Sequence, residues 1–578
     1  METVMQQTRK EKEKMKKRRM TGSQAVMESL LNEGVDLMFG YPGGAIMPVY
    51  DALYDYQDKL NHVLVRHEQG AVHAAQGYAR VTGKVGVCLV TSGPGATNTI
   101  TGIADAQIDS TPLVIISGQV ASPLLGTDAF QETDVVGISQ PITKWNYQVK
   151  RAEEIPEAIA KAFFIARTGR PGPVLIDITK DAQFTQFDYE HKPVNHVRSY
   201  KPVTAVRKDQ IAEAARLINL AKRPMALIGQ GVVLGNAESE LMSFLDKTQI
   251  PAAWTLLGLS AMPSDHHLNV GMLGMHGHYA PNVKTNESDL IIAIGMRFDD
   301  RVTGNVQKYA TNAKVVHLEI DPAEINKIIY ADVPVLGNVK ESLPMLTEMV
   351  SPNNHEAWLG EFKACYKIED QKVIQPEINP TKDGLTMGEV IRKVSEAHDD
   401  DAIMVTDVGQ HQMMASRYFK FKQSRSVVTS GGLGTMGFGL PAAIGAKMGK
   451  PDRPVCLFVG DGGFQMNIQE LGTIFQTKVP VKIILLNNEF LGMVRQWQEL
   501  FFDKRYASTE MVNPDFITIA KGYDICAEVI SERENLDAAI RRMTEHEGAY
   551  LLEVRVEKEG NVFPMVPSGA SVSDVRLE

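Results

Sequence analysis

The sequence is poor in cysteine, and the four cysteines that it contains are widely separated. Cys88, Cys365, Cys456 and Cys526 form no Cys-x-x-Cys pair among the 578 residues. This spacing argues against both a disulfide framework and a zinc site. We therefore expect a reducing compartment.

Positive charge and long apolar runs are also scarce. The formal net charge is -10 and the isoelectric point is near 5.8, whereas nucleic-acid-binding domains usually carry a basic face. No run approaches the roughly 18 uninterrupted apolar residues of a membrane span, and no secretory apolar region follows the start. These absences predict a soluble protein with neither nucleic acid nor membrane as a partner. The cytoplasm is the expected location, and a plastid enzyme stripped of its targeting segment is the alternative.

What the sequence does contain is an alternation of short apolar runs and longer amphipathic stretches. This pattern is typical of parallel sheets wrapped by helices, so we predict an α/β protein with three doubly wound parallel-sheet domains. Two polar, proline-bearing connections, "DYEHKPVNHVRSYKP" and "IQPEINPTKDG", separate the three blocks. The predicted boundaries are a basic flexible tail at 1–20, domains at 21–190, 205–350 and 385–560, and a C-terminal segment at 561–578.

The third block contains the most informative stretch, "FVGDGGFQMNIQELGTIFQTKVPVKIILLNNEF". "PVCLFV" and "VKIILL" are predicted strands with the helix "NIQELGTIFQT" between them, so Asp461 and Asn488 should follow two parallel strands of one crossover unit. A carboxylate and an amide oxygen suit Mg²⁺, and Gly460 and Gly462 would let a diphosphate approach the backbone. Each half alone is more often a turn or a helix cap. Together, at the sheet edge where ligands bind, they predict a magnesium diphosphate site.

The middle block is less distinctive. "LIGQGV" and "IAIGMRFDD" place glycines after predicted strands, where a dinucleotide could be cradled, but the full Gly-x-Gly-x-x-Gly fingerprint is absent. The residues alone leave a purely structural role open for these turns.

Gly-Asp-Gly with a downstream Asn-Asn resembles the thiamine diphosphate motif of decarboxylases and carboligases that act on 2-oxo acids. Further motifs resemble the catalytic subunits of acetohydroxyacid synthase, also called acetolactate synthase: "GYPGGAIMPVYDAL", "RHEQGAVHAAQGYAR", "TSGPGATN", "GTDAFQETD", "RFDDRVTGN", "TSGGLGTMGFGLPAAIGA" and "GMVRQWQELF". The resemblance extends from about Thr21 to the C-terminus. It implies thiamine diphosphate, Mg²⁺ and FAD as cofactors, with Asp461 and Asn488 as the metal ligands.

The resemblance also implies that each domain binds a different cofactor or a different part of one. Domain 21–190 would bind the pyrimidine of thiamine diphosphate, 205–350 would bind FAD, and 385–560 would bind the diphosphate. Glu68 would hydrogen-bond the aminopyrimidine ring and exchange a proton with it, although a lone glutamate that opens a helix is more often a surface residue. Other implied contacts are Gln410, His411, Gly434, Met436, Gly460, Gly462 and Met493 for thiamine diphosphate, and Arg170, Met275, Arg297, Asp299, Glu319 and Asp321 for FAD.

The implied reaction joins two 2-oxo acids and opens the synthesis of valine, leucine and isoleucine. Pyruvate loses carbon dioxide on the cofactor, which serves as an electron sink, and the remaining two-carbon unit is ligated to pyruvate or 2-oxobutyrate. Arg301 would bind the carboxylate of the acceptor, and Trp497 would favour 2-oxobutyrate by packing on its extra methyl group. The resemblance also implies roles for five further residues, which would line the substrate channel or contact reaction intermediates: Gly44, Ala45, Phe130, Gln131 and Lys180.

Because the two ends of the cofactor require two domains, the resemblance implies a homodimer or homotetramer with active sites between chains. A separate regulatory small subunit is also implied, and the C-terminal segment would close over the site as a lid. Two alternatives stay open. A flavin oxidoreductase of the pyruvate oxidase kind would use the same cofactors, although "GMVRQWQ" and "RFDDRVTGN" speak against it. A non-catalytic subunit of the same fold is disfavoured by Glu68, Asp461 and Asn488.

Overall fold

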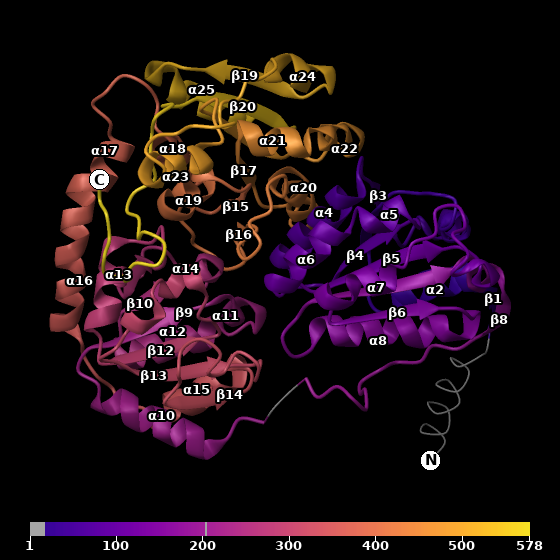
Figure 1. The fold of residues 1–578 in the computed structure, drawn as a ribbon, viewed down its shortest axis with the longest axis horizontal. Coiled ribbons are helices and arrows are strands. Elements are labelled where there is room, and N and C mark those ends of the chain that lie inside the picture. The colour runs from indigo at the N-terminus through magenta and orange to yellow at the C-terminus, as the bar shows by residue number, and fades with distance from the viewer. Residues whose placement is uncertain (1–17, 203–204) are drawn as a thin grey trace, which may run out of the picture. The chain divides into compact units, whose positions relative to one another are not determined.

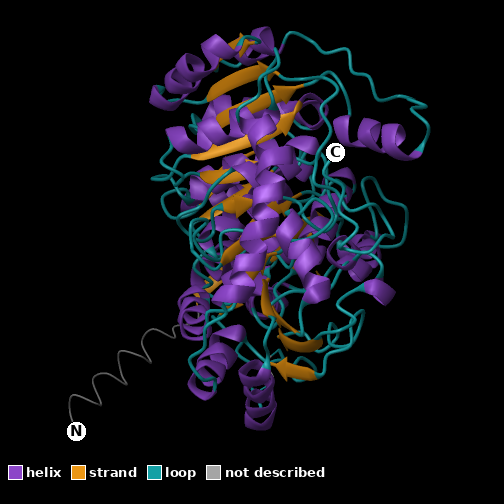
Figure 2. Ribbon diagram, turned by 90° about the vertical axis from the view of Figure 1, so that its left-hand side faces the viewer, coloured by secondary structure: helices purple, strands orange, loops and turns teal. Residues whose placement is uncertain are grey.

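Three parallel sheets dominate the protein, as the alternation of apolar and amphipathic stretches predicts. The structure, a computed structural model, describes residues 18–202 and 205–578. Within these residues each of the three sheets has six strands, all parallel, and helices cover the sheet faces (Figures 1 and 2). The predicted fold class is therefore confirmed. The chain divides into two compact units, one formed by the described residues up to Ala79 and by Lys84–Lys201, the other by Arg80–Gly83 and the described residues beyond 201.

The sheet of the first unit has the order β3-β2-β4-β5-β7-β6. Its central strands are buried along their whole length, which explains their continuous apolar runs. The strands are β2 (Leu37–Gly40), β3 (Asn61–Leu64), β4 (Gly86–Val90), β5 (Leu113–Gln119), β6 (Trp145–Val149) and β7 (Pro173–Thr179). The helices are α2 (Gly22–Asn32), α3 (Met47–Leu53), α4 (Glu68–Thr82), α5 (Pro94–Thr97), α6 (Ile100–Ile108), α7 (Val135–Ser139), α8 (Ile155–Arg167) and α9 (Lys180–Phe184).

The end of the predicted N-terminal tail has to be corrected. Residues 1–17 lie outside the described part of the chain, but Arg18–Thr21 form strand β1, which pairs antiparallel with β8 (Gln186–Tyr189). Met20 is buried in the core of this unit. Thr21 then starts α2 through a capping box with Gln24, in which side chain and backbone bond reciprocally at 3.2 and 3.0 Å. The expected tail was wrong for residues 18–20 because their backbone pairs with a distant strand.

The second unit contains the other two sheets. The central sheet, ordered β11-β10-β9-β12-β13-β14, consists of β9 (Pro224–Ile228), β10 (Ala252–Trp254), β11 (Asn269–Met272), β12 (Leu290–Ile294), β13 (Lys314–Glu319) and β14 (Val333–Leu336). Its helices are α10 (Lys208–Leu220), α11 (Gln230–Leu234), α12 (Glu238–Thr248), α13 (Tyr279–Glu287), α14 (Asp300–Thr303) and α15 (Val339–Met349). Helices α16 (Glu356–Glu369) and α17 (Gln375–Ile378) follow and lead to the last domain.

The last sheet has the order β16-β15-β17-β18-β20-β19. Its strands are β15 (Ile403–Thr406), β16 (Val427–Val428), β17 (Val455–Gly460), β18 (Lys482–Asn487), β19 (Cys526–Ile530) and β20 (Tyr550–Arg555). Its helices are α18 (Met387–Ala397), α19 (Gln410–Tyr418), α20 (Gly439–Gly449), α21 (Asp461–Met466), α22 (Leu471–Thr477), α23 (Gly492–Phe501), α24 (Phe516–Gly522) and α25 (Leu536–Glu545). Across the described residues, no helix combines the length and apolar character needed to span a membrane.

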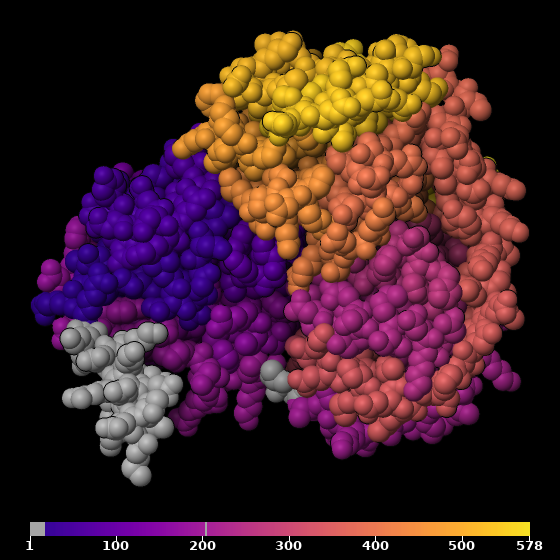
Figure 3. Space-filling view, turned by 180° about the vertical axis from the view of Figure 1, so that it is seen from behind, coloured from indigo at the N-terminus to yellow at the C-terminus, as the bar shows by residue number. Residues whose placement is uncertain are grey.

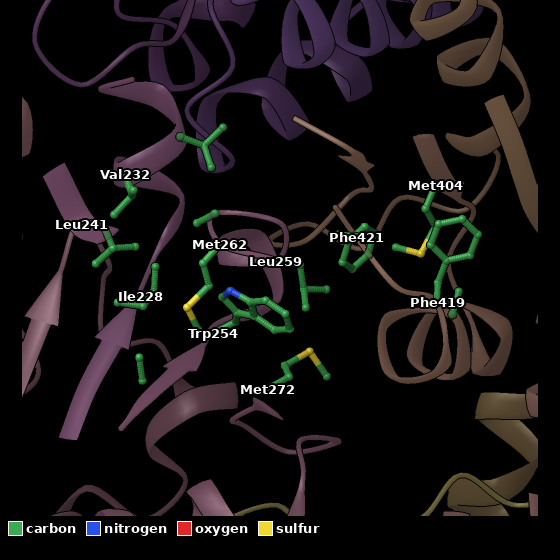
Figure 4. Packing of buried hydrophobic residues seen from close by; sticks show 14 of the residues in the cluster. Ile228, Val232, Leu241, Trp254, Leu259, Met262, Met272, Met404, Phe419 and Phe421 are labelled. Carbon is green, nitrogen blue, oxygen red and sulfur yellow. The ribbon is translucent and has the colours of Figure 1, made fainter. Parts of the chain in front are cut away.

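The two domains of the second unit share one apolar core. Figure 4 shows Trp254 and Leu259 of the central domain facing Phe421 of the last domain, with the ring centroids of Trp254 and Phe421 6.5 Å apart. Ser264 accepts a hydrogen bond from the backbone N–H of Phe421 at 2.8 Å. The segment that carries α16 runs along the edge of both domains (Figure 3). These contacts make the two domains one compact unit.

Candidate functional site

Asp461 and Asn488 follow the neighbouring parallel strands β17 and β18, as the sequence predicts. The strands pair with Gly460 opposite Leu486, so both side chains lie at the same carboxyl edge of the sheet. Asp461 Oδ2 accepts a hydrogen bond from the side chain of Asn513 at 2.7 Å, whereas Oδ1 is buried and has no hydrogen-bond partner in the described chain. Leaving a buried carboxylate oxygen unsatisfied is unfavourable. A bound Mg²⁺ would supply the missing partner, so these residues fit the predicted ion.

The local structure around Asp461 is the start of a helix rather than the alternative of a simple turn. Asp461 begins the short helix α21, and the predicted helix after it is split into a 3₁₀ turn at Ile468–Glu470 and α22. Burial raises the pKa of Asp461, and the hydrogen bond from Asn513 opposes this shift. A metal ion would favour the charged carboxylate.

Glycine at positions 460 and 462 is needed for close packing. A Cβ atom on Gly460 would lie 2.9 Å from His411 Nδ1, and one on Gly462 would lie 2.6 Å from a methyl carbon of Leu491 and 3.7 Å from the terminal methyl group of Met436. The two glycines thus allow the predicted cofactor contacts His411 and Met436 to approach the start of α21. Gly434, in the same loop as Met436, has a φ of +66°, which favours glycine.

His411 and Gln410 begin helix α19 beside this turn. Burial lowers the pKa of His411 to about 4, so the imidazole is neutral at pH 7, and its Nε2 is another buried atom with no hydrogen-bond partner within the described residues. Gln410, in contrast, is fully engaged. Its Nε2 donates to Gln496 Oε1 at 3.0 Å and to the carbonyl of Gly560 at 2.9 Å, and its Oε1 accepts from Asn488 at 3.3 Å.

In the first unit, the turn after β4 lies close to both Glu68 and Gln131. Glu68 is the first residue of α4, and its Oε2 accepts a hydrogen bond from Asn98 at 2.9 Å. A Cβ atom on Gly95 would lie 3.4 Å from Glu68 Oε1, and one on Gly93 would lie 2.9 Å from the carbonyl oxygen of Gln131. Gln131 itself has a φ of +59°. The turn therefore places a carboxylate and a strained amide residue on its two sides.

The other residues expected near the substrate in this unit are more dispersed. Ala45 is tied to the same turn, since its N–H donates to Thr91 Oγ1 at 3.3 Å, and its carbonyl accepts from Gln183 of α9 at 2.8 Å. Lys180 is the first residue of α9 and is partly exposed. Gly44 is exposed, and Phe130 is 89% exposed.

Four of the six predicted FAD contacts gather at the carboxyl edge of the central sheet. Arg297 and Asp299 follow β12, and Glu319 and Asp321 end or follow the neighbouring strand β13. Asp299 caps α14, with Oδ1 accepting from the backbone N–H groups of Arg301 and Val302 at 3.0 and 3.2 Å, and its pKa is raised by burial. Acidic residues at strand ends bind ribose hydroxyls in dinucleotide sites, so this set fits the predicted flavin nucleotide.

The other two predicted FAD contacts, Arg170 and Met275, do not follow these two strands. Arg170 belongs to the first unit, where its Nε donates to Ser110 Oγ at 2.8 Å. Met275 contacts Arg301: its N–H donates to the Arg301 carbonyl at 2.8 Å, and its sulfur lies 3.6 Å from Arg301 Nη1. The Arg301 side chain is 60% exposed, and its closest carboxylate contact is Asp300 at 3.8 Å. Its guanidinium is thus accessible to a carboxylate ligand.

Comparison with known proteins decides the family. Three family models match, described as the thiamine pyrophosphate enzyme N-terminal TPP binding domain at residues 20–138, the central domain at 211–346 and the C-terminal TPP binding domain at 407–554. The acetolactate synthase large subunit of Corynebacterium glutamicum is 45% identical over 96% of this chain and 90% of its own. The Escherichia coli acetolactate synthase isozyme 2 large subunit is 45% identical over 96% of this chain and 99% of its own. The chain belongs to the acetolactate synthase large-subunit family.

Membership in the acetolactate synthase family confirms the resemblance identified in the sequence. The two outer domains are thiamine diphosphate-binding domains, which confirms this cofactor and an enzyme that depends on it. The roles of the individual site residues, Mg²⁺ and FAD stay predictions.

Helix α23 carries two more residues that the acetolactate synthase resemblance singled out, Met493 and Trp497. They are four residues apart and so lie on one face of the helix. Trp497 is half-buried, and its ring centroid lies 5.1 Å from that of Phe501. Gln496, which the sequence did not suggest, is buried on the same helix. Its Oε1 accepts from the N–H of Val562 at 2.9 Å, and its Nε2 donates to the Val562 carbonyl at 3.1 Å. The predicted lid segment therefore packs on the helix that carries Trp497.

Two other residues of the site were missed. Asp407 is buried at the end of β15 and accepts backbone N–H groups from Val408, Gly437 and Gly439 at 2.8, 3.1 and 2.8 Å, which fixes the loop that contains Met436. "AIMVTD" carried the same strand-end signal as the Asp461 motif. Asn513 had no such signal, because it reaches Asp461 from a loop 52 residues further along the chain.

Proposed function

We propose that this protein is the catalytic subunit of a thiamine diphosphate-dependent acetolactate synthase, a transferase. It decarboxylates pyruvate and ligates the two-carbon unit to a second 2-oxo acid, giving 2-acetolactate from pyruvate or 2-aceto-2-hydroxybutyrate from 2-oxobutyrate. These are first common steps in the synthesis of branched-chain amino acids. The observation that carries the proposal is the unsatisfied Asp461 Oδ1 beside Asn488, at adjacent strand ends of a thiamine diphosphate-binding domain.

When bound, thiamine diphosphate supplies the electron sink that decarboxylation requires. Asp461 and Asn488 would hold Mg²⁺ through oxygen atoms, and the ion would offset the negative charge of the diphosphate. Asn513 fixes the Asp461 carboxylate, and the neutral His411 contributes an imidazole Nε2 without requiring a counter-charge. Further contacts to the cofactor come from Gln410, Gly434, Met436, Gly460, Gly462 and Met493.

Glu68 binds the pyrimidine end of the cofactor. Its carboxylate, held by Asn98, would exchange a proton with the aminopyrimidine ring when the cofactor is bound. Glu68 of one chain would meet the diphosphate site of a partner chain, so the active form is a homodimer or homotetramer. The regulatory partner is a separate small subunit, in keeping with relatives that are described as large subunits. The proposed location is the cytoplasm.

The acceptor binds near Arg301 and Trp497. The exposed guanidinium of Arg301 grips the carboxylate of the 2-oxo acid in a bidentate manner. Trp497 packs on the methyl group that distinguishes 2-oxobutyrate from pyruvate. Gln131 hydrogen-bonds a reacting oxygen, and Lys180 contacts the reacting groups.

FAD occupies the carboxyl edge of the central sheet. Its contacts are Arg170, Met275, Arg297, Asp299, Glu319 and Asp321. The carboligation transfers no electrons to the flavin, so the proposed flavin role is structural rather than redox.

Product stoichiometry tests the proposal against the oxidase alternative. With purified protein, pyruvate, thiamine diphosphate, Mg²⁺ and FAD, we expect one carbon dioxide and one acetolactate for every two pyruvate molecules consumed, with no reduction of an added electron acceptor. Acetate or acetyl phosphate formed together with a reduced acceptor would assign the protein to the oxidase class instead. Absence of any turnover with folded, cofactor-loaded protein would favour the non-catalytic subunit.

A further inference from the structure

A buried ion pair that the proposed mechanism does not use joins two helices of the second unit. Arg417 Nη1 donates to Glu369 Oε1, and the two side chains are 1% and 0% exposed. Arg417 lies in the last turn of α19, the helix that begins with Gln410 and His411, and Glu369 is the last residue of α16. The pair thus links the helix that borders the diphosphate site to a helix outside both sheets.

Both side chains of the pair form hydrogen bonds with the backbone of the same loop. Arg417 Nη2 donates to the carbonyl groups of His276 and Gly277, both at 2.8 Å. Glu369 Oε2 accepts the backbone N–H of Tyr279 at 2.8 Å. The pair therefore satisfies two carbonyl groups and one N–H group of the loop between Met275 and Tyr279.

This loop contacts Arg301, the proposed ligand of the acceptor carboxylate. The N–H of Met275 donates to the carbonyl of Arg301 at 2.8 Å, and the Met275 carbonyl accepts from Val566 of the C-terminal segment at 2.8 Å. A buried ion pair is weak evidence for added stability, because desolvation offsets the attraction between the charges. The pair can instead act by fixing the position of this loop.

We propose that Arg417 and Glu369 are positioning residues for the acceptor. They fix the 275–279 loop against α19, and the loop in turn fixes Arg301 relative to the diphosphate site on the same helix. The inference rests on the proposed function, since Arg301 is the proposed ligand of the acceptor carboxylate. Productive ligation needs the reactants held in a set orientation, whereas decarboxylation of the first pyruvate does not involve the acceptor.

The test is Arg417→Lys. Lysine keeps the charge but lacks the planar fork that bonds Glu369 and two carbonyl groups at once. Arg533→Lys is the matched control, because Arg533 also pairs with a buried glutamate, Glu389 at 3.0 Å, and also donates to two carbonyl groups, those of Lys382 and Gly384. The assays measure the KM for 2-oxobutyrate, the rate of carbon dioxide release from pyruvate, and the ratio of acetaldehyde to ligated product.

We expect Arg417→Lys to raise the KM for 2-oxobutyrate by about tenfold or more and to raise the acetaldehyde ratio, with carbon dioxide release within about twofold of the wild type. Arg533→Lys should leave all three unchanged. An unchanged KM and product ratio in Arg417→Lys, or an equal fall in every rate, would overturn the positioning role.

If Arg417→Lys does not fold, the double variant Arg417→Met/Glu369→Leu leaves no unpaired buried charge and is judged by the same criteria. Failure of the proposed function would give a different result, because the wild-type protein would then form no acetolactate. A wild type that forms acetolactate beside an Arg417→Lys variant with normal acceptor kinetics would overturn the further inference alone.

Discussion

The side-chain amide of Asn513 donates to Asp461 Oδ2 at 2.7 Å and to Asn487 Oδ1 at 3.1 Å, and so bridges the ends of β17 and β18. One oxygen of the proposed metal ligand is thereby fixed, and the other is left for the ion. Partners of this kind orient a ligating carboxylate and typically change metal affinity by about 10–100-fold when removed.

We therefore expect Asn513→Ala to weaken Mg²⁺-dependent binding of thiamine diphosphate by about 10–100-fold, and Asp461→Asn to weaken it further. Titration calorimetry with each variant measures the affinity for thiamine diphosphate in the presence of Mg²⁺.

Because burial raises the pKa of Asp461, protons should compete with the ion, and Mg²⁺ affinity should fall as the pH is lowered toward that pKa. Equal Mg²⁺ affinity in wild type and Asn513→Ala would rule out the bridging role.

Asn488 and Asn513 differ in whether their place at the site could be predicted from the sequence. Asn488 was predictable because a rule about parallel strand ends is local: a strand, a helix and a strand can be read from 30 or so consecutive residues. Asn513 and Gln496 reach the site through loop and helix packing, and no local pattern encodes those contacts. Residues 18–20 were wrongly placed in the tail for the same reason, since their partner strand β8 begins at Gln186. Fold class follows from periodicity, whereas the supporting shell of a site depends on tertiary structure.

Glu68 gives a sharper test of the proton-transfer role. Glu68→Gln keeps an oxygen that can accept from Asn98, but it removes the group that exchanges a proton with the cofactor. We expect kcat to fall by about 10²–10⁴-fold with little change in thiamine diphosphate affinity. Steady-state rates and a binding titration on the same preparation separate the two effects. Near-normal kcat in this variant would show that another group moves the proton.

Trp497 should control the choice of acceptor. Replacing it by leucine removes most of the surface proposed to pack on the methyl group of 2-oxobutyrate. One methylene is worth about 1–3 kcal/mol, so the preference for 2-oxobutyrate over pyruvate should fall by about 10–200-fold. Both products are measured in one reaction with the acceptors in competition, and Phe501→Leu, which alters the neighbouring ring, is the control. An unchanged product ratio in Trp497→Leu would remove this residue from the acceptor pocket.

Asp177 should make the stability of the first unit depend on pH. It is fully buried and accepts hydrogen bonds from Ser117, Gln119 and Gln148 at 2.7, 3.0 and 3.0 Å, and Gln119 also holds the carbonyl of Thr133, two residues beyond Gln131. Burial raises the pKa of Asp177 to about 6. A raised pKa means that the folded state holds the proton more tightly than the unfolded state. The contribution of Asp177 to stability is therefore fully present below about pH 4 and is lost as the pH rises through about 6.

Asp177→Asn mimics the protonated form and should not show this loss. The stability of the variant relative to the wild type should therefore rise between about pH 4 and pH 7, by on the order of 3 kcal/mol for the shift given above. Thermal unfolding across this range checks the difference between the two proteins, which cancels the other titrating groups. A constant difference at all pH values would contradict the raised pKa.

The most direct test of the whole account is to omit each cofactor in turn while acetolactate is measured from pyruvate. We expect acetolactate to form with the full set and to disappear without thiamine diphosphate, without Mg²⁺ and without FAD, with no electron acceptor reduced in any arm. Acetolactate formation that persists without thiamine diphosphate, or turnover that always reduces an acceptor, would contradict it.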